Sequence, residues 1–159
     1  MANTQAICTS FKAELLNAVH QFGSPTIVSR TSLTVPTADS FKAALYLVSA
    51  TTGAANTVYT ATGEVSGTNY VAGGVALTGT QDWIEPTSSG TTGFSTPTAN
   101  IIYTTVTLSV AFDAVMIYNA TQSNKAVSVH TFGSQTVTAG TFTLTMPTND
   151  ATNALVRLV

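Results

Sequence analysis

The sequence predicts a mainly β domain, an antiparallel β-sandwich or jelly-roll-like fold with one N-terminal α-helix. Short apolar runs rich in Val, Ile, Thr, Phe and Tyr indicate strands, because Gly, Asn, Ser and Pro residues separate them. Threonine makes up roughly a fifth of the 159 residues, and its branched Cβ suits a pleated sheet while its hydroxyl keeps the outer face wet. We expect about seven to nine strands, as in a sandwich.

The segment from Phe112 to Val159 shows the strand pattern most clearly. Between Thr141 and Met146, apolar residues alternate with threonines, and this period of two is typical of a half-buried antiparallel strand. Turn chemistry is predicted to divide the segment at four places: Asn119–Asn124, Gly133–Ser134, Ala139–Gly140 and Pro147–Asn153.

A helical apolar stripe runs from Gln5 to Phe22, and Gly23 followed by Pro25 predicts its end. We therefore divide the chain into an N-terminal helix or arm, residues 1–24, and a single β domain, residues 25–159. The helix either covers one open end of the β core or docks on a neighbouring subunit.

The β domain is expected to begin with an edge strand and a strand buried on both faces, followed by shorter extended pieces. Glu64 stands alone among uncharged residues, and a hydrogen bond from turn amides to its carboxylate is favoured over a metal site. The expected strands are Thr26–Val35, Phe41–Val48, Thr57–Tyr59, Val71–Leu77 and Ile101–Ser109.

Residues from Gly79 to Asn100 form a predicted long loop, because two prolines enclose a run of Ser, Thr and Gly. Loops of this length inside a compact domain are usually functional or mobile. Trp83 and Phe94 are large apolar residues in these polar surroundings. They are either buried anchors of the loop or contact residues for a partner.

Charge is scarce: 8% of residues are charged, against about 25% in an ordinary domain. Weakly charged β proteins tend to associate, so the composition favours a protein built into an assembly. The five cations form no basic run, which argues against nucleic acid. Neither a membrane-spanning segment nor a signal peptide is recognisable, and Cys8 is the one cysteine, so we expect synthesis in a reducing cytoplasm.

Catalytic chemistry is not apparent in the sequence, and we expect no enzyme, no cofactor and no metal. His20 and His130 have no ligand partners at metal-binding spacing, and His130 is interpreted as a partly buried strand histidine. A phosphate-binding loop and a nucleophile elbow are both missing. Cys8, in the predicted helix, has no basic neighbour to activate it.

Several segments together carry a resemblance to a known family. They are SFKAELLNAVHQFG near the start, DSFKAALY, GEVSGTNYVAGG, IYNATQSNKAV, and FGSQTVTAGTFTLTMPTNDATNALVRL near the end. In this order they resemble a family of small structural proteins of tailed-bacteriophage virions. The resemblance leaves out chiefly the loop from Gly79 to Asn100 and rests on strand and turn residues, not on a catalytic signature.

The resemblance implies a virion protein, and we expect a capsid decoration or cement protein on the capsid surface, assembled in the host cytoplasm. Its implied partners are the major capsid protein and copies of itself. The expected contact residues lie in the N-terminal helix and the long loop: Phe11, Leu15, Trp83 and Phe94. Alternatives are a tail, adaptor or head-fibre component, or a carbohydrate-binding module that stacks sugars on Trp83, Tyr70 and Tyr103.

Overall fold

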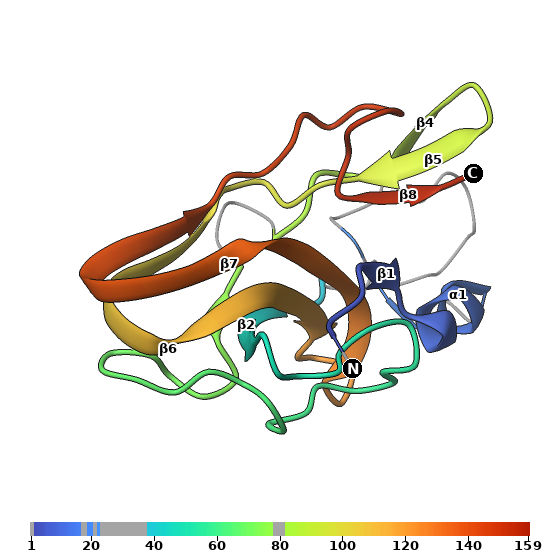
Figure 1. Ribbon diagram of the computed structural model, residues 1–159. Helices are drawn as coiled ribbons and strands as arrows, with labels where there is room; N and C mark the ends of the chain where they lie inside the picture. Colours follow the sequence, from blue (N-terminus) through green and yellow to red (C-terminus); the bar gives the residue numbers. More distant parts are fainter. Residues whose placement is uncertain (1, 17–18, 21, 23–37, 78–81) are drawn as a thin grey trace.

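The protein is mainly β, with antiparallel sheets and one short helix, as the sequence predicts (Figure 1). The computed structural model describes residues 2–16, 19–20, 22, 38–77 and 82–159. Two sheets form a sandwich-like arrangement, one with the strand order β1-β7-β6-β2-β3 and one with the order β4-β5-β8. The elements are β1 (Ala6–Ile7), α1 (Thr9–Leu16), β2 (Phe41–Leu47), β3 (Val75–Ala76), β4 (Thr87–Ser89), β5 (Thr92–Ser95), β6 (Ile101–Asn119), β7 (Lys125–Leu144) and β8 (Val156–Leu158).

One long hairpin, formed by β6 and β7, dominates the larger sheet (Figure 1). Its turn lies at the predicted Asn119–Asn124, where Ser123 and Asn124 adopt positive φ values of 54° and 59°. The turns predicted at Gly133–Ser134 and Ala139–Gly140 are wrong, because β7 passes through both positions.

These glycines instead mark places where the pairing of β7 with β6 is irregular. The register shifts several times between the pairs Tyr103–Phe142 and Ala114–Thr131, yet the two pairs share one register. The register shift caused by extra residues in one strand is therefore compensated by extra residues in the other strand. Such β-bulges bend and twist a hairpin, so a local turn signal here produces curvature and not a chain reversal.

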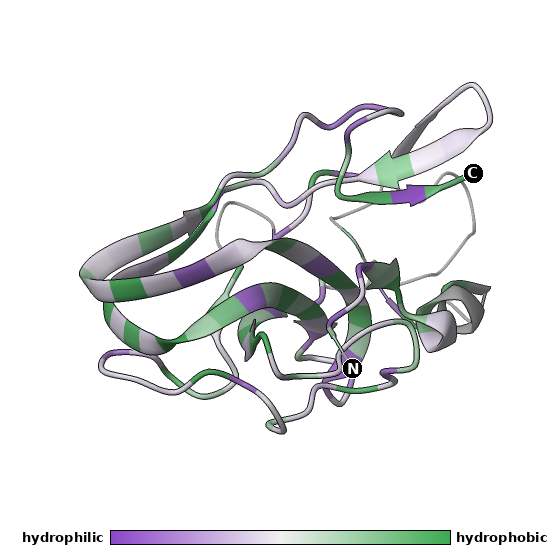
Figure 2. Cartoon of the chain, viewed as in Figure 1, coloured by the Kyte–Doolittle hydropathy of each residue, from purple (hydrophilic) through white to green (hydrophobic). Residues whose placement is uncertain are grey.

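The strand predicted at Phe41–Val48 is confirmed as β2, whose side chains are largely buried on both faces. The short β3 lies against it because Gly74 has no side chain. A Cβ on Gly74 would stand 1.7 Å from the carbonyl oxygen of Ala43, and the positive φ of 72° also favours glycine. Figure 2 shows apolar and pale residues alternating along β6 and β7, the pattern of strands with one face in the core.

The N-terminal helix is shorter than the predicted Gln5–Phe22. Ala6 and Ile7 form β1 on the edge of β7, and helix α1 then runs from Thr9 to Leu16. Cys8 lies between the two and is buried, and it is not in the helix as predicted. Backbone pairing with β7 thus takes precedence over the helical pattern of the first residues. Phe11 and Cys8 belong to the same core as the strands.

Four further predictions are compared with the structure. The strand Thr26–Val35 and the domain boundary after residue 24 lie outside the described residues. The loop predicted from Gly79 to Asn100 is wrong over its centre, because β4 and β5 form a hairpin there. Gly90, with φ 58°, opens its two-residue turn, as a type II′ turn requires. Val71, predicted to be in a strand, is 70% exposed and precedes β3.

Candidate functional site

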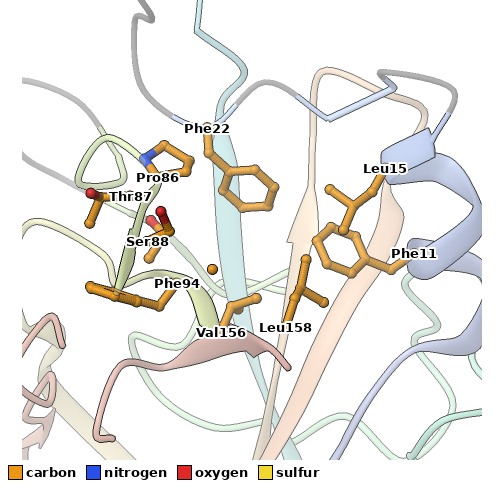
Figure 3. A pocket seen from close by; sticks show the side chains of 11 residues that line it. Phe11, Leu15, Phe22, Pro86, Thr87, Ser88, Phe94, Val156 and Leu158 are labelled. Atoms are coloured by element: carbon orange, nitrogen blue, oxygen red, sulfur yellow. The ribbon is translucent and has the colours of Figure 1, made fainter. Parts of the chain in front are cut away.

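An apolar groove with a volume of about 540 Å³ separates helix α1 from the sheet β4-β5-β8 (Figure 3). Its apolar wall comes from both ends of the chain and from the β4–β5 hairpin. None of the described residues that line the groove carries a charge. The main apolar contributors are Phe11, Leu15, Phe22, Phe94, Val156 and Leu158.

Three of the four predicted contact residues line this groove, although Phe11 at 0% and Phe94 at 8% exposure are largely covered. Phe11 and Leu15 come from one face of α1, while Phe94 projects from β5 on the opposite side. The fourth, Trp83, does not line the groove and is 0% exposed. It supports the groove from behind, since its ring meets Phe22 edge-on with 4.9 Å between centroids. Of the two roles considered for Trp83 and Phe94, the structure shows the buried anchor for Trp83, and Phe94 is also buried at 8% exposure.

An aromatic cluster gives the groove a rigid floor. Phe22 stacks on Phe41 with centroids 5.1 Å apart and meets Phe11 edge-on at 5.8 Å. Phe41 in turn meets Trp83 at 5.6 Å, so the residue that opens β2 fixes the base of the groove. Such aromatic pairs contribute about 0.5–1.5 kcal/mol each beyond burial of their area. The groove is therefore held open by the same packing that forms the core.

Sequence reasoning missed the contribution of the C-terminal strand. β8 pairs antiparallel with β5, which places Leu158 opposite Gly93 and Val156 opposite Ser95. Because Gly93 has no side chain, the space beside Leu158 on β5 stays empty, and Leu158 is 42% exposed. The apolar residues in Leu155–Val159 could have indicated a strand. Its pairing with β5 could not have been predicted, because β5 lies far away in the chain.

A second cluster gathers the tyrosines around Glu64. Tyr59 Oη donates to Glu64 Oε2 at 2.5 Å, Tyr70 Oη donates to Oε1 at 2.8 Å, and the N–H of Gly73 donates to Oε1 at 2.8 Å. The predicted bond from a turn amide to this carboxylate is thus confirmed. Burial raises the pKa of all five tyrosines, which include Tyr46, Tyr103 and Tyr118. These hydroxyls are donors to fixed acceptors, so the cluster fastens a loop to the sheet.

Buried polar groups also secure the hairpin turn. Asn119 Nδ2 donates to Asp39 Oδ2 at 2.6 Å and lies 3.1 Å from His20 Nδ1. Its Oδ1 accepts the backbone N–H groups of Thr121 and Gln122, both at 3.1 Å. An Asn side chain that bonds the backbone two residues on stabilises a turn. These buried polar groups therefore have a structural role, which is to stabilise the β6–β7 turn.

His130 lies in β7, as predicted. Its Nε2 is 2.9 Å from Ser128 Oγ, and its ring borders a small cavity walled by apolar side chains such as Val115 and Leu155. Burial lowers the pKa of His130 to about 4. The imidazole is therefore neutral at pH 7.

Within the described residues, no group of three or more His, Cys, Asp or Glu side chains could hold a metal ion. The same part of the chain contains no helix long and apolar enough to span a bilayer. Two of the three aromatic residues considered for sugar stacking are buried, Trp83 at 0% and Tyr103 at 1% exposure, so they present no open face to a sugar.

Comparisons with models of protein families, with curated proteins and with solved structures each found no match to this chain. A functional proposal therefore has to start from its own residues and their arrangement.

Proposed function

We propose that this protein is a structural component of a tailed-bacteriophage virion that decorates the capsid and stabilises it by bridging capsid subunits. It acts without catalysis, in contact with the major capsid protein and with copies of itself, on the capsid surface after assembly in the host cytoplasm. The observation that carries the proposal is the uncharged groove between helix α1 and the sheet β4-β5-β8, where Leu15 and Leu158 are the more accessible lining residues. The family resemblance of the sequence points to the same class of protein.

The groove suits an apolar side chain presented by a capsid subunit. Full burial of one large apolar side chain contributes about 1.5–3 kcal/mol. That energy is small for a single contact, but a decoration protein is present in many copies, and linked contacts strengthen one another. A rigid aromatic floor, formed by Phe22 and Phe41, supports such a contact because little ordering is needed on binding.

The surface of the β6–β7 hairpin also supports a role in an assembly. From Ile101 to Leu144 the only charged residues are Asp113 and Lys125. Asp113 accepts a hydrogen bond from Asn3 Nδ2 at 2.5 Å, so one of the two charges is engaged within the chain. Uncharged exposed strands can approach a neighbouring subunit without desolvating ions.

Gel electrophoresis of purified phage particles from the strain that carries this gene tests the proposal. A decoration protein gives a band comparable to that of the major capsid protein, whereas an adaptor or tail component, present in about a dozen copies, gives a faint one. Absence of the chain from particles would overturn the proposal.

A pair of neighbouring substitutions tests the groove itself. Leu158→Glu places a charge in the groove, and we expect it to abolish binding of the purified protein to particles that lack it. Val159→Glu is the matched control, because Val159 is 96% exposed and does not line the groove. Equal binding by both variants would exclude the groove as the contact surface.

A further inference from the structure

The last part of β7 presents an unpaired strand edge on the side away from β6. Register pairs Ile101 with Leu144, Ile102 with Thr143 and Tyr103 with Phe142. Next to them, the backbone N–H of Met146 donates to Asn100 Oδ1 at 2.9 Å, on the β6 side. Backbone groups alternate in direction along an antiparallel strand, so those of Thr141, Thr143 and Thr145 point outward. We call these three residues the threonine edge.

The threonine edge is open. All three residues are exposed, and Thr145 lies just beyond the end of β7 at Leu144. No strand that the structure describes pairs with them on the side away from β6. On the same side of β7, nearer the hairpin turn, β1 adds antiparallel through the pairs Ala6–Val129 and Ile7–Ser128. This side of β7 therefore already accepts one strand and continues past it without a partner.

Among the described residues, the threonine edge carries none of the features that usually protect a strand edge from pairing. Natural edge strands are usually protected by Lys, by Pro or by an inward charge. Here the sequence contains no charged residue between Lys125 and Asp150, and Pro147 comes only after the edge ends. At the other end, Ala139 with a φ of 45° marks an irregularity. The regular part of the edge is therefore short and ends on both sides, which favours pairing with one partner strand over open-ended association of many strands.

We propose that the occupant of the threonine edge is the same edge of a second copy of this chain, paired antiparallel about a two-fold axis through Thr143. In this register Thr143 lies opposite its own copy, and Thr141 lies opposite Thr145 of the other chain. Each opposed pair exchanges two backbone hydrogen bonds. The two hairpins then form one continuous sheet across the dimer.

The side chains favour self-pairing. Cross-strand threonine pairs stabilise a sheet, and with no charge on the edge a two-fold arrangement opposes no like charges. An isologous contact of this kind closes after two copies, because each edge uses the same residues on both sides. The inference gives the contact between copies in the proposed function a definite surface, but it concerns the isolated chain and holds whether or not the protein binds capsids.

Analytical ultracentrifugation of purified variants tests the dimer. Wild-type protein is expected to be dimeric and Thr143→Pro monomeric with an unchanged circular dichroism spectrum. Proline removes only an outward N–H at this position and is tolerated on a free edge. Thr143→Lys and Thr143→Glu, each alone, are expected to be monomeric because like charges face each other across the axis. Mixed in equal amounts, they are expected to restore a one-to-one dimer.

The lysine and glutamate pair keeps the test decisive if the proline variant fails to fold. Thr104→Lys, on an exposed position of β6 away from the edge, is the control and is expected to remain dimeric. A wild-type chain that stays monomeric at the highest attainable concentration would overturn the proposal. So would a dimer that persists in both charged variants, or a mixture that fails to dimerise. None of these outcomes depends on phage particles, so they are distinguishable from failure of the capsid proposal.

Discussion

Tyr70 connects a loop to strand β2 through both functions of its hydroxyl, which donates to Glu64 Oε1 at 2.8 Å and accepts the N–H of Leu45 at 3.0 Å. The same carboxylate holds Tyr59 and the amide of Gly73. One acidic side chain therefore orders the segment between β2 and β3.

Replacement of Glu64 by Gln is expected to lower the free energy of unfolding by about 3 kcal/mol, because three donors lose a charged acceptor. Urea denaturation followed by circular dichroism measures the change. Glu85→Gln is the matched control: Glu85 is exposed, and its neutralisation should change stability by no more than about 0.5 kcal/mol. Equal stability of the two variants would show that the cluster around Glu64 contributes little.

Alkaline titration is expected to show no gradual ionisation of tyrosine in the folded protein. Burial raises the pKa of all five tyrosines above the ordinary value of 10.0. The unfolded chain releases these protons first as the pH rises, so the stability gained from burial of neutral tyrosines is complete below pH 10 and falls above it. Tyrosinate absorbance should therefore appear together with unfolding, in one cooperative step. A separate, earlier ionisation step would contradict the prediction.

Acid should destabilise the fold through His130. Its pKa is lowered from 6.5 to about 4 by burial, so between these values the unfolded chain binds a proton that the folded chain does not. Stability is therefore lost as the pH falls through this window, by about 3 kcal/mol in total. The control is His130→Gln, which cannot take up the proton and should lose correspondingly less stability between pH 6.5 and pH 4. NMR titration of the imidazole gives an independent readout, and a midpoint near 6.5 in the folded protein would refute the assignment.

Gly74→Ala is expected to prevent folding or to cost more than about 3 kcal/mol, since the added Cβ would stand 1.7 Å from the carbonyl oxygen of Ala43. Gly90→Ala isolates the effect of the backbone angle alone. Gly90 has a φ of 58° but no atom within 4 Å of the added Cβ, so the loss should be about 1 kcal/mol. Thermal unfolding of both variants measures the stability lost in each case and so distinguishes a steric clash from an unfavourable backbone angle. Similar losses of stability in the two variants would contradict the predicted clash.

Patterns local to a few residues predicted the strand type well. Alternation around Thr141–Met146 and the apolar segment Phe41–Val48 correspond to β7 and β2, because burial of one or both faces imposes the pattern directly. Glycines near positions 133 and 140 were misread as turns, since a bulge and a turn use the same residues. Only the pairing register of β7 with β6 distinguishes a bulge from a turn at these glycines.

The groove was only partly predictable for the same reason. Phe11, Leu15 and Phe94 were recognised in the sequence as large apolar side chains, and all three line the groove. Val156 and Leu158 did not stand out, because their place depends on pairing with β5. Trp83 resembled a contact residue in its polar sequence surroundings, whereas its contacts with Phe22 and Phe41 place it inside the core.

The pairing of β1 with β7 has a consequence for synthesis of the protein. Ala6 and Ile7 are translated long before their partners Val129 and Ser128. During most of translation the beginning of the nascent chain has no partner strand, and the sheet closes only after the hairpin has emerged. The pairing of β1 with β7 therefore has to wait until β7 has been translated, and β1 has to remain free of other contacts until then.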